Sequence, residues 1–274
     1  MTDPVLLAQM LALLLAIGLF AGVLAGLLGV GGGIVLVPAF YYAFGTLGFG
    51  GEALMQLAVA TSLATIVVTS LRSLRSHHQQ NAVDWHILRT WAPGIALGAA
   101  SGVLVVSQLD AHVLQFIFGG LALLIGVFMT AGRMGWRVAQ DMPTGATRVA
   151  ASGGVGVLSV LMGVGGGSFG VPIMTLHNVS IHKAVGTAAG FGLLIAVPSV
   201  AGFMLLILPA EVRPPLTVGS VNLVAFAIVI SMTLISAPWG ARLAHALHPT
   251  PLRRIFGVFL MLVAVNMILE AWRV

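Results

Sequence analysis

Long apolar runs alternate with short polar stretches along almost the whole chain of 274 residues. Several runs reach or approach the ~20 residues that an α-helix needs to cross a bilayer. The pattern predicts ten helical elements, at residues 5–28, 33–44, 53–71, 87–107, 113–131, 149–162, 167–176, 184–208, 218–239 and 252–272. The second and the seventh are too short to span ~30 Å at about 1.5 Å per residue, and each follows a cluster of glycines. We therefore interpret each as half of a hairpin that turns back inside the membrane.

The composition strengthens the membrane interpretation. Hydrophobic residues make up 59% of the chain and charged residues only 7%, whereas soluble domains carry about a quarter of their residues as charges. We therefore predict an all-α polytopic membrane protein. Residues 1–4 lack the basic character of a signal peptide, so we expect the first run to be retained as a membrane helix.

Basic residues are unevenly distributed among the loops. The three clearest basic stretches lie at residues 72–78, 133–148 and 242–254, and the positive-inside rule places all three in the cytoplasm. This orientation puts ten of the twelve Lys and Arg residues on the cytoplasmic side: Arg72, Arg75, Arg89, Arg133, Arg137, Arg148, Lys183, Arg242, Arg253 and Arg254. It requires each glycine-broken element to begin and end on the same side. The bases are dispersed over loops and form no patch, so the net charge of +5 does not indicate nucleic-acid binding.

The chain contains an internal repeat. Residues 22–38 read GVLAGLLGVGGGIVLVP and residues 156–172 read GVLSVLMGVGGGSFGVP, with eleven of the seventeen positions identical. A shorter match follows in the same order, with AVAT at 58–61 and AVGT at 184–187. Two matches in one order indicate that the two halves share one fold.

The repeat divides the chain into three parts: a first transmembrane repeat at 1–131, a cytoplasmic linker at 132–147 and a second transmembrane repeat at 148–274. The charge pattern starts the first repeat outside and the second inside, so we predict two inverted repeats. Each has about four transmembrane helices and a glycine-broken re-entrant hairpin. Secondary transporters are built in this way, with the solute site at the breaks. The alternative is that the glycines only allow helices to pack closely.

Two glycine triplets are the candidate substrate-binding site. They are Gly31, Gly32 and Gly33 in the first repeat and Gly165, Gly166 and Gly167 in the second. Consecutive glycines break a helix, and the segment that follows begins with free N–H groups and a positive dipole end, which bind anions. Ser168 adds a hydroxyl donor beside the second triplet, where the equivalent Ile34 adds none. We predict a two-sided cradle for a small oxyanion.

Hydroxyl side chains downstream extend the candidate site. Thr61 and Ser62 lie in the third element, and Thr187 holds the repeat position of Thr61. Their hydroxyls can solvate an anion, but Ser and Thr in helices also bond to their own backbone. Both interpretations stay open for each residue.

Acidic residues are missing from the middle of the predicted elements. The seven lie in or near loops and segment ends: Asp3, Glu52, Asp84, Asp110, Asp141, Glu211 and Glu270. Intramembrane cation sites and proton relays use carboxylates, so the pattern weakens a cation site, although backbone carbonyls can bind Na⁺, and leaves an anion pathway open. The chain has no cysteine, and no residues have the spacing of a metal site or a catalytic triad. We expect no catalytic residue, no metal, no cofactor and no enzymatic activity.

The duplicated GVGGG…VP, with AVAT and AVGT downstream, resembles the TauE/SafE family, the sulfite exporters. The resemblance covers nearly the whole chain. It implies a membrane transporter for sulfite, organosulfonates or related anions, with the family's glycine motifs at residues 29–33 and 163–167. It does not fix the substrate, because members differ in cargo.

The leading hypothesis is therefore a secondary transporter that exports sulfite or a small organosulfonate across the cell inner membrane. The alternatives are a carrier or channel for a carboxylate or a metal ion, and a non-transporting membrane scaffold. The expected partners are a small anion and the lipid bilayer. The glycines at 98 and 102 and at 119 and 120 allow packing either within one chain or between the subunits of a homodimer.

Overall fold

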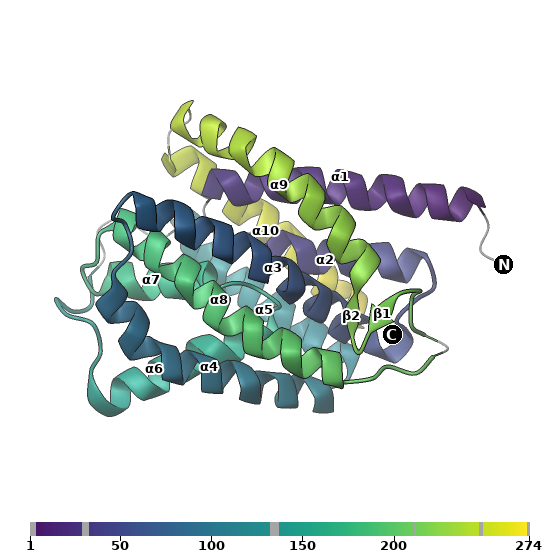
Figure 1. Ribbon diagram of the computed structural model, residues 1–274, viewed down its shortest axis with the longest axis horizontal. Coiled ribbons are helices and arrows are strands. Elements are labelled where there is room, and N and C mark those ends of the chain that lie inside the picture. The colour runs from purple at the N-terminus through teal and green to yellow at the C-terminus, as the bar shows by residue number, and fades with distance from the viewer. Residues whose placement is uncertain (1–3, 29–32, 132–136, 211, 247–248, 273–274) are drawn as a thin grey trace.

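The computed structural model describes residues 4–28, 33–131, 137–210, 212–246 and 249–272. Its described part folds into ten α-helices, a 3-10 turn and one small hairpin (Figure 1). The helices are α1 Pro4–Leu28, α2 Gly33–Thr46, α3 Leu54–Gln79, α4 Trp85–Gln108, α5 Ala111–Ala131, α6 Gly145–Leu161, α7 Gly167–Leu176, α8 Ile181–Leu205, α9 Leu223–Ala246 and α10 Pro249–Trp272. The turn η1 is Gly51–Ala53, and β1 Thr217–Val218 pairs antiparallel with β2 Val221–Asn222. Every predicted element corresponds to one helix.

Two helix ends differ most from the prediction. Helix α3 continues to Gln79 and so carries the basic stretch that the sequence assigned to a loop. Helix α9 starts at Leu223, because the chain first makes the β1–β2 hairpin around Gly219, whose φ is +59°. The apolar Val218 and Val221 in this hairpin extended the predicted element beyond the helix.

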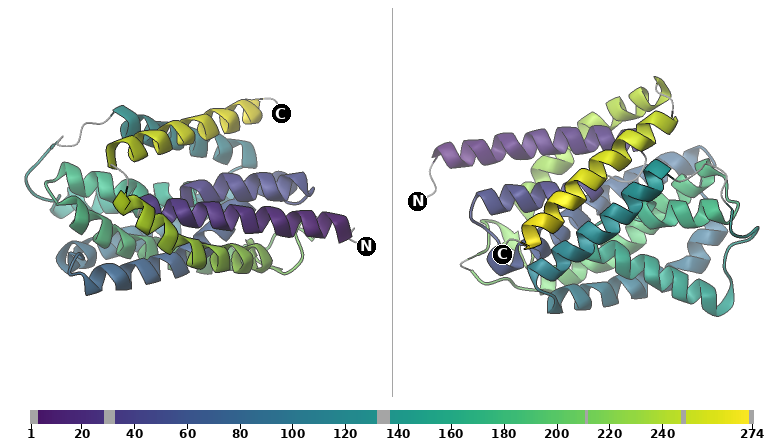
Figure 2. Two further views of the ribbon diagram at one scale, coloured as in Figure 1. Left: turned by 90° about the horizontal axis from the view of Figure 1, so that it is seen from above. Right: turned by 180° about the vertical axis from the view of Figure 1, so that it is seen from behind.

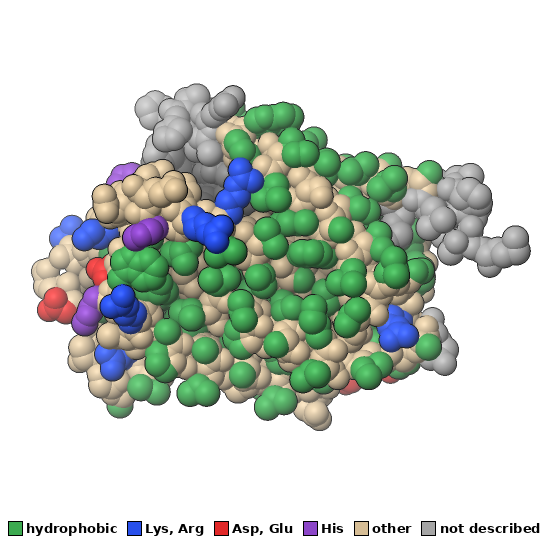
Figure 3. All heavy atoms as spheres, viewed as in Figure 1, with side chains coloured by type: hydrophobic (Ala, Val, Ile, Leu, Met, Phe, Trp, Pro, Cys, Tyr) green, Lys and Arg blue, Asp and Glu red, His purple; other side chains and the backbone are tan. Residues whose placement is uncertain are grey.

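The fold is that of a multi-pass membrane protein, as predicted. Six helices in the described part of the chain are long and apolar enough to cross a membrane, and they correspond to α3, α4, α5, α8, α9 and α10. Figure 3 shows a broad band of hydrophobic side chains, with most of the visible charges gathered at one end of this face. A lipid bilayer solvates such a band. Helices α2 and α7 are short, with 14 and 10 residues.

The two halves interlock instead of standing apart. Helix α1 packs along α9 and α6 packs along α4, so the first helix of each half lies against the fourth of the other. In α1, a Cβ on Gly22 would collide with Ser236 and lie 2.7 Å from Thr233 Cα. In α6, a Cβ on Gly156 would collide with the backbone of Ile95 in the same way. Gly22 and Gly156, which hold the same repeat position, thus make equivalent close helix contacts in the two halves.

Helices at the same place in the two repeats run in opposite directions. On α8, Gly186 touches Ala82 just beyond the end of α3, whereas Gly192 touches Ser70 further back along α3. Helices α5 and α10 also lie side by side and antiparallel (Figure 2), with Gly119 against Ile268. An inverted repeat requires such opposite directions, and the inverted repeat itself stays a prediction.

The glycines of α4 and α5 mainly serve contacts within the chain. Gly98 faces the Gly153 backbone and Gly102 faces Val160, both on α6. Gly119 faces α10, and a Cβ on Gly120 would have no described atom within 4 Å. The homodimer stays a prediction.

Candidate functional site

The second glycine turn connects α6 to α7 in the interior of the protein. Its amides begin by closing back on α6, where Gly163 N donates to Val160 O at 2.9 Å and Val164 N donates to Ser159 O at 2.9 Å. Gly163 has φ +62°, a conformation that favours glycine. A Cβ there would also lie 2.6 Å from Val37 Cγ2. The turn therefore needs glycine for its backbone and for its packing.

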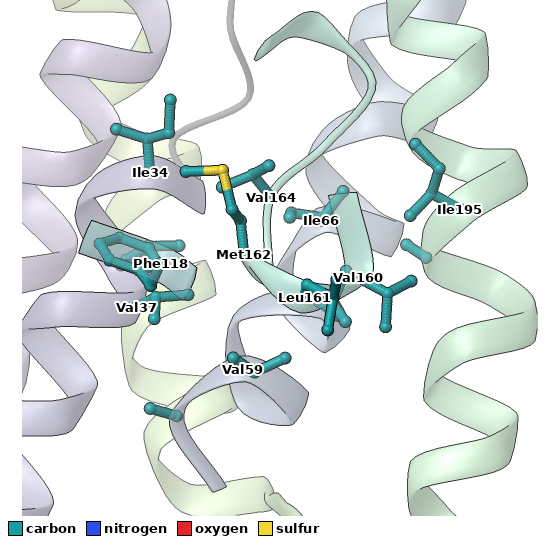
Figure 4. Packing of buried hydrophobic residues seen from close by; sticks show 14 of the residues in the cluster. Ile34, Val37, Val59, Ile66, Phe118, Val160, Leu161, Met162, Val164 and Ile195 are labelled. Carbon is teal, nitrogen blue, oxygen red and sulfur yellow. The ribbon is translucent and has the colours of Figure 1, made fainter. Parts of the chain in front are cut away.

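The last residue of the first glycine motif lies against the second turn. Gly33 is the described residue of the first triplet, and a Cβ on it would lie 3.0 Å from both Gly163 O and Val164 Cα. Figure 4 shows Ile34 of α2 facing Met162 and Val164 of the second turn, with Ile66 of α3 beside them. Gly31 and Gly32 lie outside the described residues. Segments far apart in sequence thus form one junction, which we call the glycine junction: Gly33 together with residues 163–168.

Polar donors at the glycine junction are buried and not all paired. The first bonds of α7 run from Gly170 N to Gly166 O at 2.8 Å and from Ser168 N to Gly165 O at 3.5 Å. No described residue accepts a hydrogen bond from the amides of Gly165, Gly166 or Gly167. Buried donors without acceptors are costly. A bound anion would satisfy them and would also face the positive end of the helix dipole.

Ser168 contributes one more buried donor. Its side chain is 4% exposed, and its Oγ has no hydrogen-bond partner among the described residues. Such an orphan group in a packed interior calls for an explanation. A polar ligand at the glycine junction provides one.

Ser62 ties α3 to the glycine junction. Its buried Oγ donates to Gly163 O at 2.8 Å, and Thr65 Oγ1 donates to Ser62 O at 2.6 Å. Helix α3 is buried without interruption from Leu57 to Ile66, so this part of it is a firm support for the turn. Of the predicted hydroxyl residues on α3, Ser62 is the one with a described hydrogen bond to the turn.

The matched threonines make a different kind of contact. Thr61 Oγ1 accepts from Asn222 N at 3.2 Å, and Thr187 Oγ1 accepts from Asp84 N at 2.8 Å. Asn222 and Asp84 each stand directly before a helix, α9 and α4. Each threonine therefore holds the start of a helix from the other half. Their role in solute binding stays a prediction.

Asn222 and Asp84, the polar residues directly before α9 and α4, were not among the site residues predicted from the sequence. Asp84 Oδ1 accepts from His86 N and Ile87 N at 3.0 Å, and Asn222 Oδ1 accepts from Ala225 N at 2.8 Å. Both side chains cap a helix start, as Asp and Asn commonly do. Their matching positions before the fourth helix of each half could have been recognised from the sequence.

An aromatic pair backs the second turn. A Cβ on Gly166 would collide with Phe191 of α8, and one on Gly170 would lie 2.8 Å from the Phe191 ring. Phe191 stacks on Trp91 of α4, with ring centroids 5.8 Å apart. Both side chains are almost fully buried. Neither residue belongs to the site predicted from the sequence.

Comparison with known proteins decides the family. The family model described as "Sulfite exporter TauE/SafE" matches residues 14–267. The chain belongs to this family. This match confirms the resemblance that the duplicated glycine motif indicated.

Relatives of this TauE/SafE protein carry transporter names. A "Probable membrane transporter protein" of Haemophilus influenzae is 30% identical over 89% of this chain and 92% of its own length. Similarly named proteins of Methanocaldococcus jannaschii and Xylella fastidiosa are 23% and 26% identical, over 89% and 90% of this chain and 90% of their own lengths. No solved structure matches significantly. Family and relatives point to a membrane transporter of a small solute in a lipid bilayer, and not to an enzyme.

Proposed function

We propose that this TauE/SafE protein exports sulfite or a small organosulfonate by alternating access, and that the anion binds at the glycine junction. The observation that carries the proposal is the set of buried donors at Gly165, Gly166, Gly167 and Ser168 without described acceptors. These donors lie at the start of α7, and the residues just before them, Gly163 and Val164, contact Gly33 of the other repeat. A sulfite or sulfonate group offers three acceptor oxygens to such donors.

The loops support a re-entrant second hairpin. Val138 N, in the segment before α6, donates to Leu176 O at the end of α7 at 2.8 Å. Asn178 Nδ2, just after α7, donates to Gln140 Oε1 at 3.2 Å. Helices α6 and α7 together therefore leave and return to one end of the protein. We infer that this hairpin reaches into the membrane from one side without crossing it.

The opposite end gathers other loops. Gly50 N, after α2, donates to Val212 O, after α8, at 2.7 Å. Gln56 Nε2, near the start of α3, donates to Leu109 O, after α4, at 2.7 Å. The first hairpin thus returns to the end opposite to the second, which supports inverted repeats in the membrane.

Charge supports the orientation. The end that carries the second hairpin holds most of the described cations, in the helix ends and loops there: Arg75, Arg89, Arg137, Arg148 and Lys183. The other end holds Arg213. The positive-inside rule makes the first of these ends cytoplasmic. We infer the inner membrane, with the inside-negative potential driving anions outward.

Reconstituted flux tests the function. Purified protein in proteoliposomes is expected to move sulfite and sulfoacetate faster than empty vesicles do. Gly166→Leu should abolish flux, because its side chain would occupy the space of Phe191 and the anion. Gly120→Leu is the matched control, since it faces open space on α5. Flux at the level of empty vesicles for the unaltered protein would sink the proposal.

A carboxylate is the second candidate solute, because the same donors suit its two oxygens. A panel of unlabelled carboxylates, sulfonates and metal salts competing with labelled sulfoacetate separates the candidates. Inhibition by sulfite and sulfonates supports the proposal. Inhibition only by carboxylates or by metal ions would reassign the transporter.

A further inference from the structure

Polar groups surround the two glycine turns unequally. Three hydroxyl residues next to the second turn have apolar counterparts at the same repeat positions in the other half. The pairs are Ser168 with Ile34, Ser159 with Ala25, and Ser62 with Ala188. In all three pairs the hydroxyl lies next to the second turn. The turns themselves do not differ, because residues 29–33 and 163–167 both read GVGGG, so the contrast lies in the residues around them.

The hydroxyls around the second turn include two without partners. Ser168 Oγ and Ser159 Oγ are both buried, and neither has a hydrogen-bond partner among the described residues. Ser159 lies in the last turns of α6, and its carbonyl receives Val164 N of the second turn. A buried serine normally satisfies its hydroxyl. Two orphan hydroxyls flanking one turn indicate a polar ligand there.

The side facing the first turn is apolar. Ile34 is 2% exposed, and Figure 4 shows it beside Met162 and Val164, with Val37 and Phe118 below. Anion oxygens placed against these groups would lose hydration without gaining donors, which is unfavourable. A methyl or ethyl group in the same place would gain from leaving water.

We propose that the solute binds in one orientation, with its oxyanion end on the second turn and an apolar end against Ile34. In this scheme Ser168 and Ser159 hold the oxyanion, and the contrast between Ser168 and Ile34 sets selectivity. The protein thus favours anions that carry a small apolar end over compact inorganic oxyanions. This inference rests on the proposed binding at the glycine junction.

The test replaces the residue that follows each glycine triplet, Ser168 in the second repeat and Ile34 in the first. Proteoliposome counterflow is measured with ethanesulfonate and with sulfite for the unaltered protein, Ser168→Ala, Ile34→Ser and Ser231→Ala. Ser231 is an exposed serine of α9 and serves as the control. Removing a donor to a charged group weakens binding about tenfold, so Ser168→Ala should raise the KM for both solutes by about that factor. Ile34→Ser should raise the rate ratio of sulfite to ethanesulfonate several-fold.

The outcomes separate the two claims. Preference for ethanesulfonate in the unaltered protein, shifted by Ile34→Ser and not by Ser231→Ala, supports the oriented site. Flux of both solutes with the same ratio in every variant would overturn the orientation and leave the proposed function intact. Flux of neither solute in the unaltered protein would overturn the proposed function itself. Ser159→Ala gives an independent check, because it should raise KM like Ser168→Ala without touching α7.

Discussion

The two glycine turns share a motif but differ in what surrounds them. After the first triplet come Ile34 and Leu36, and after the second come Ser168 and Gly170. Gly170 makes room for Phe191, which stacks on Trp91, whereas the repeat position of Phe191 in the first half is Thr65. In the first half the large side chain is Leu36 on the hairpin helix α2, whereas in the second half it is Phe191 on α8, which packs against the hairpin. The comparison teaches that the repeat preserves the GVGGG motif, whereas the side chains packed around the motif differ between the two halves.

The largest expected effect comes from the backbone of the second turn. Gly163→Ala combines a strained positive φ with a Cβ 2.6 Å from Val37 and 3.0 Å from the Val59 backbone. We expect loss of nearly all flux and a clearly lower melting temperature in detergent. Gly145→Ala has a similar positive φ but faces open space, so it isolates the cost of strain. Equal losses in the two variants would contradict a packing role for Gly163.

The second largest effect is expected from replacing Phe191 and Gly170 by the residues of the first half. Phe191→Thr leaves a cavity next to Trp91 and is expected to cost about 3–5 kcal/mol, as aromatic truncations in cores do. Gly170→Leu alone should also destabilise, because its Cβ would press on the Phe191 ring. The double variant restores the first-half combination and should recover part of both losses. Melting temperatures in detergent measure this coupling, and strictly additive losses would refute it.

A smaller effect is expected from the tie between α3 and the second turn. Ser62→Ala removes the donor to Gly163 O and leaves a buried carbonyl without this partner. We expect destabilisation of about 1–3 kcal/mol. Thermal unfolding in detergent measures it, with Ser107→Ala on α4 as the control. A loss no greater than that of the control would show that the tie contributes little.

The smallest effects should be equal in the two halves. Thr61→Val and Thr187→Val each remove one acceptor for a backbone amide, so each should cost about 1 kcal/mol of stability. Flux measurements decide between support and solute binding. Unchanged KM values fit helix support alone, whereas a raised KM in both variants would place the threonines in the solute path.

The sequence predicted the helices well, for a physical reason, whereas the glycine triplets as a substrate site stay a prediction. Apolar runs of membrane length and the duplicated GVGGG are local signals that do not depend on distant contacts. The contact of Gly33 with Gly163 and Val164 extends the inverted-repeat hypothesis, since two breaks from inverted halves are expected to meet near the middle.

The remaining features depend on tertiary contacts between helices. Thr61 and Thr187 were grouped with the glycines by sequence position, but their hydroxyls point to Asn222 and Asp84 across the repeat. Phe191 looked like one more apolar residue of a membrane helix. Only the packed structure shows that it fills the space left by Gly166 and Gly170.

Solute protection of a single thiol tests the glycine junction most directly. The chain has no cysteine, so Ser168→Cys in reconstituted protein gives one reactive position. The rate at which a small methanethiosulfonate reagent labels S168C should fall when sulfite or ethanesulfonate is present, and the rate for S107C on α4 should not. If S168C transports both anions but its labelling rate ignores them, the solute does not bind at the glycine junction.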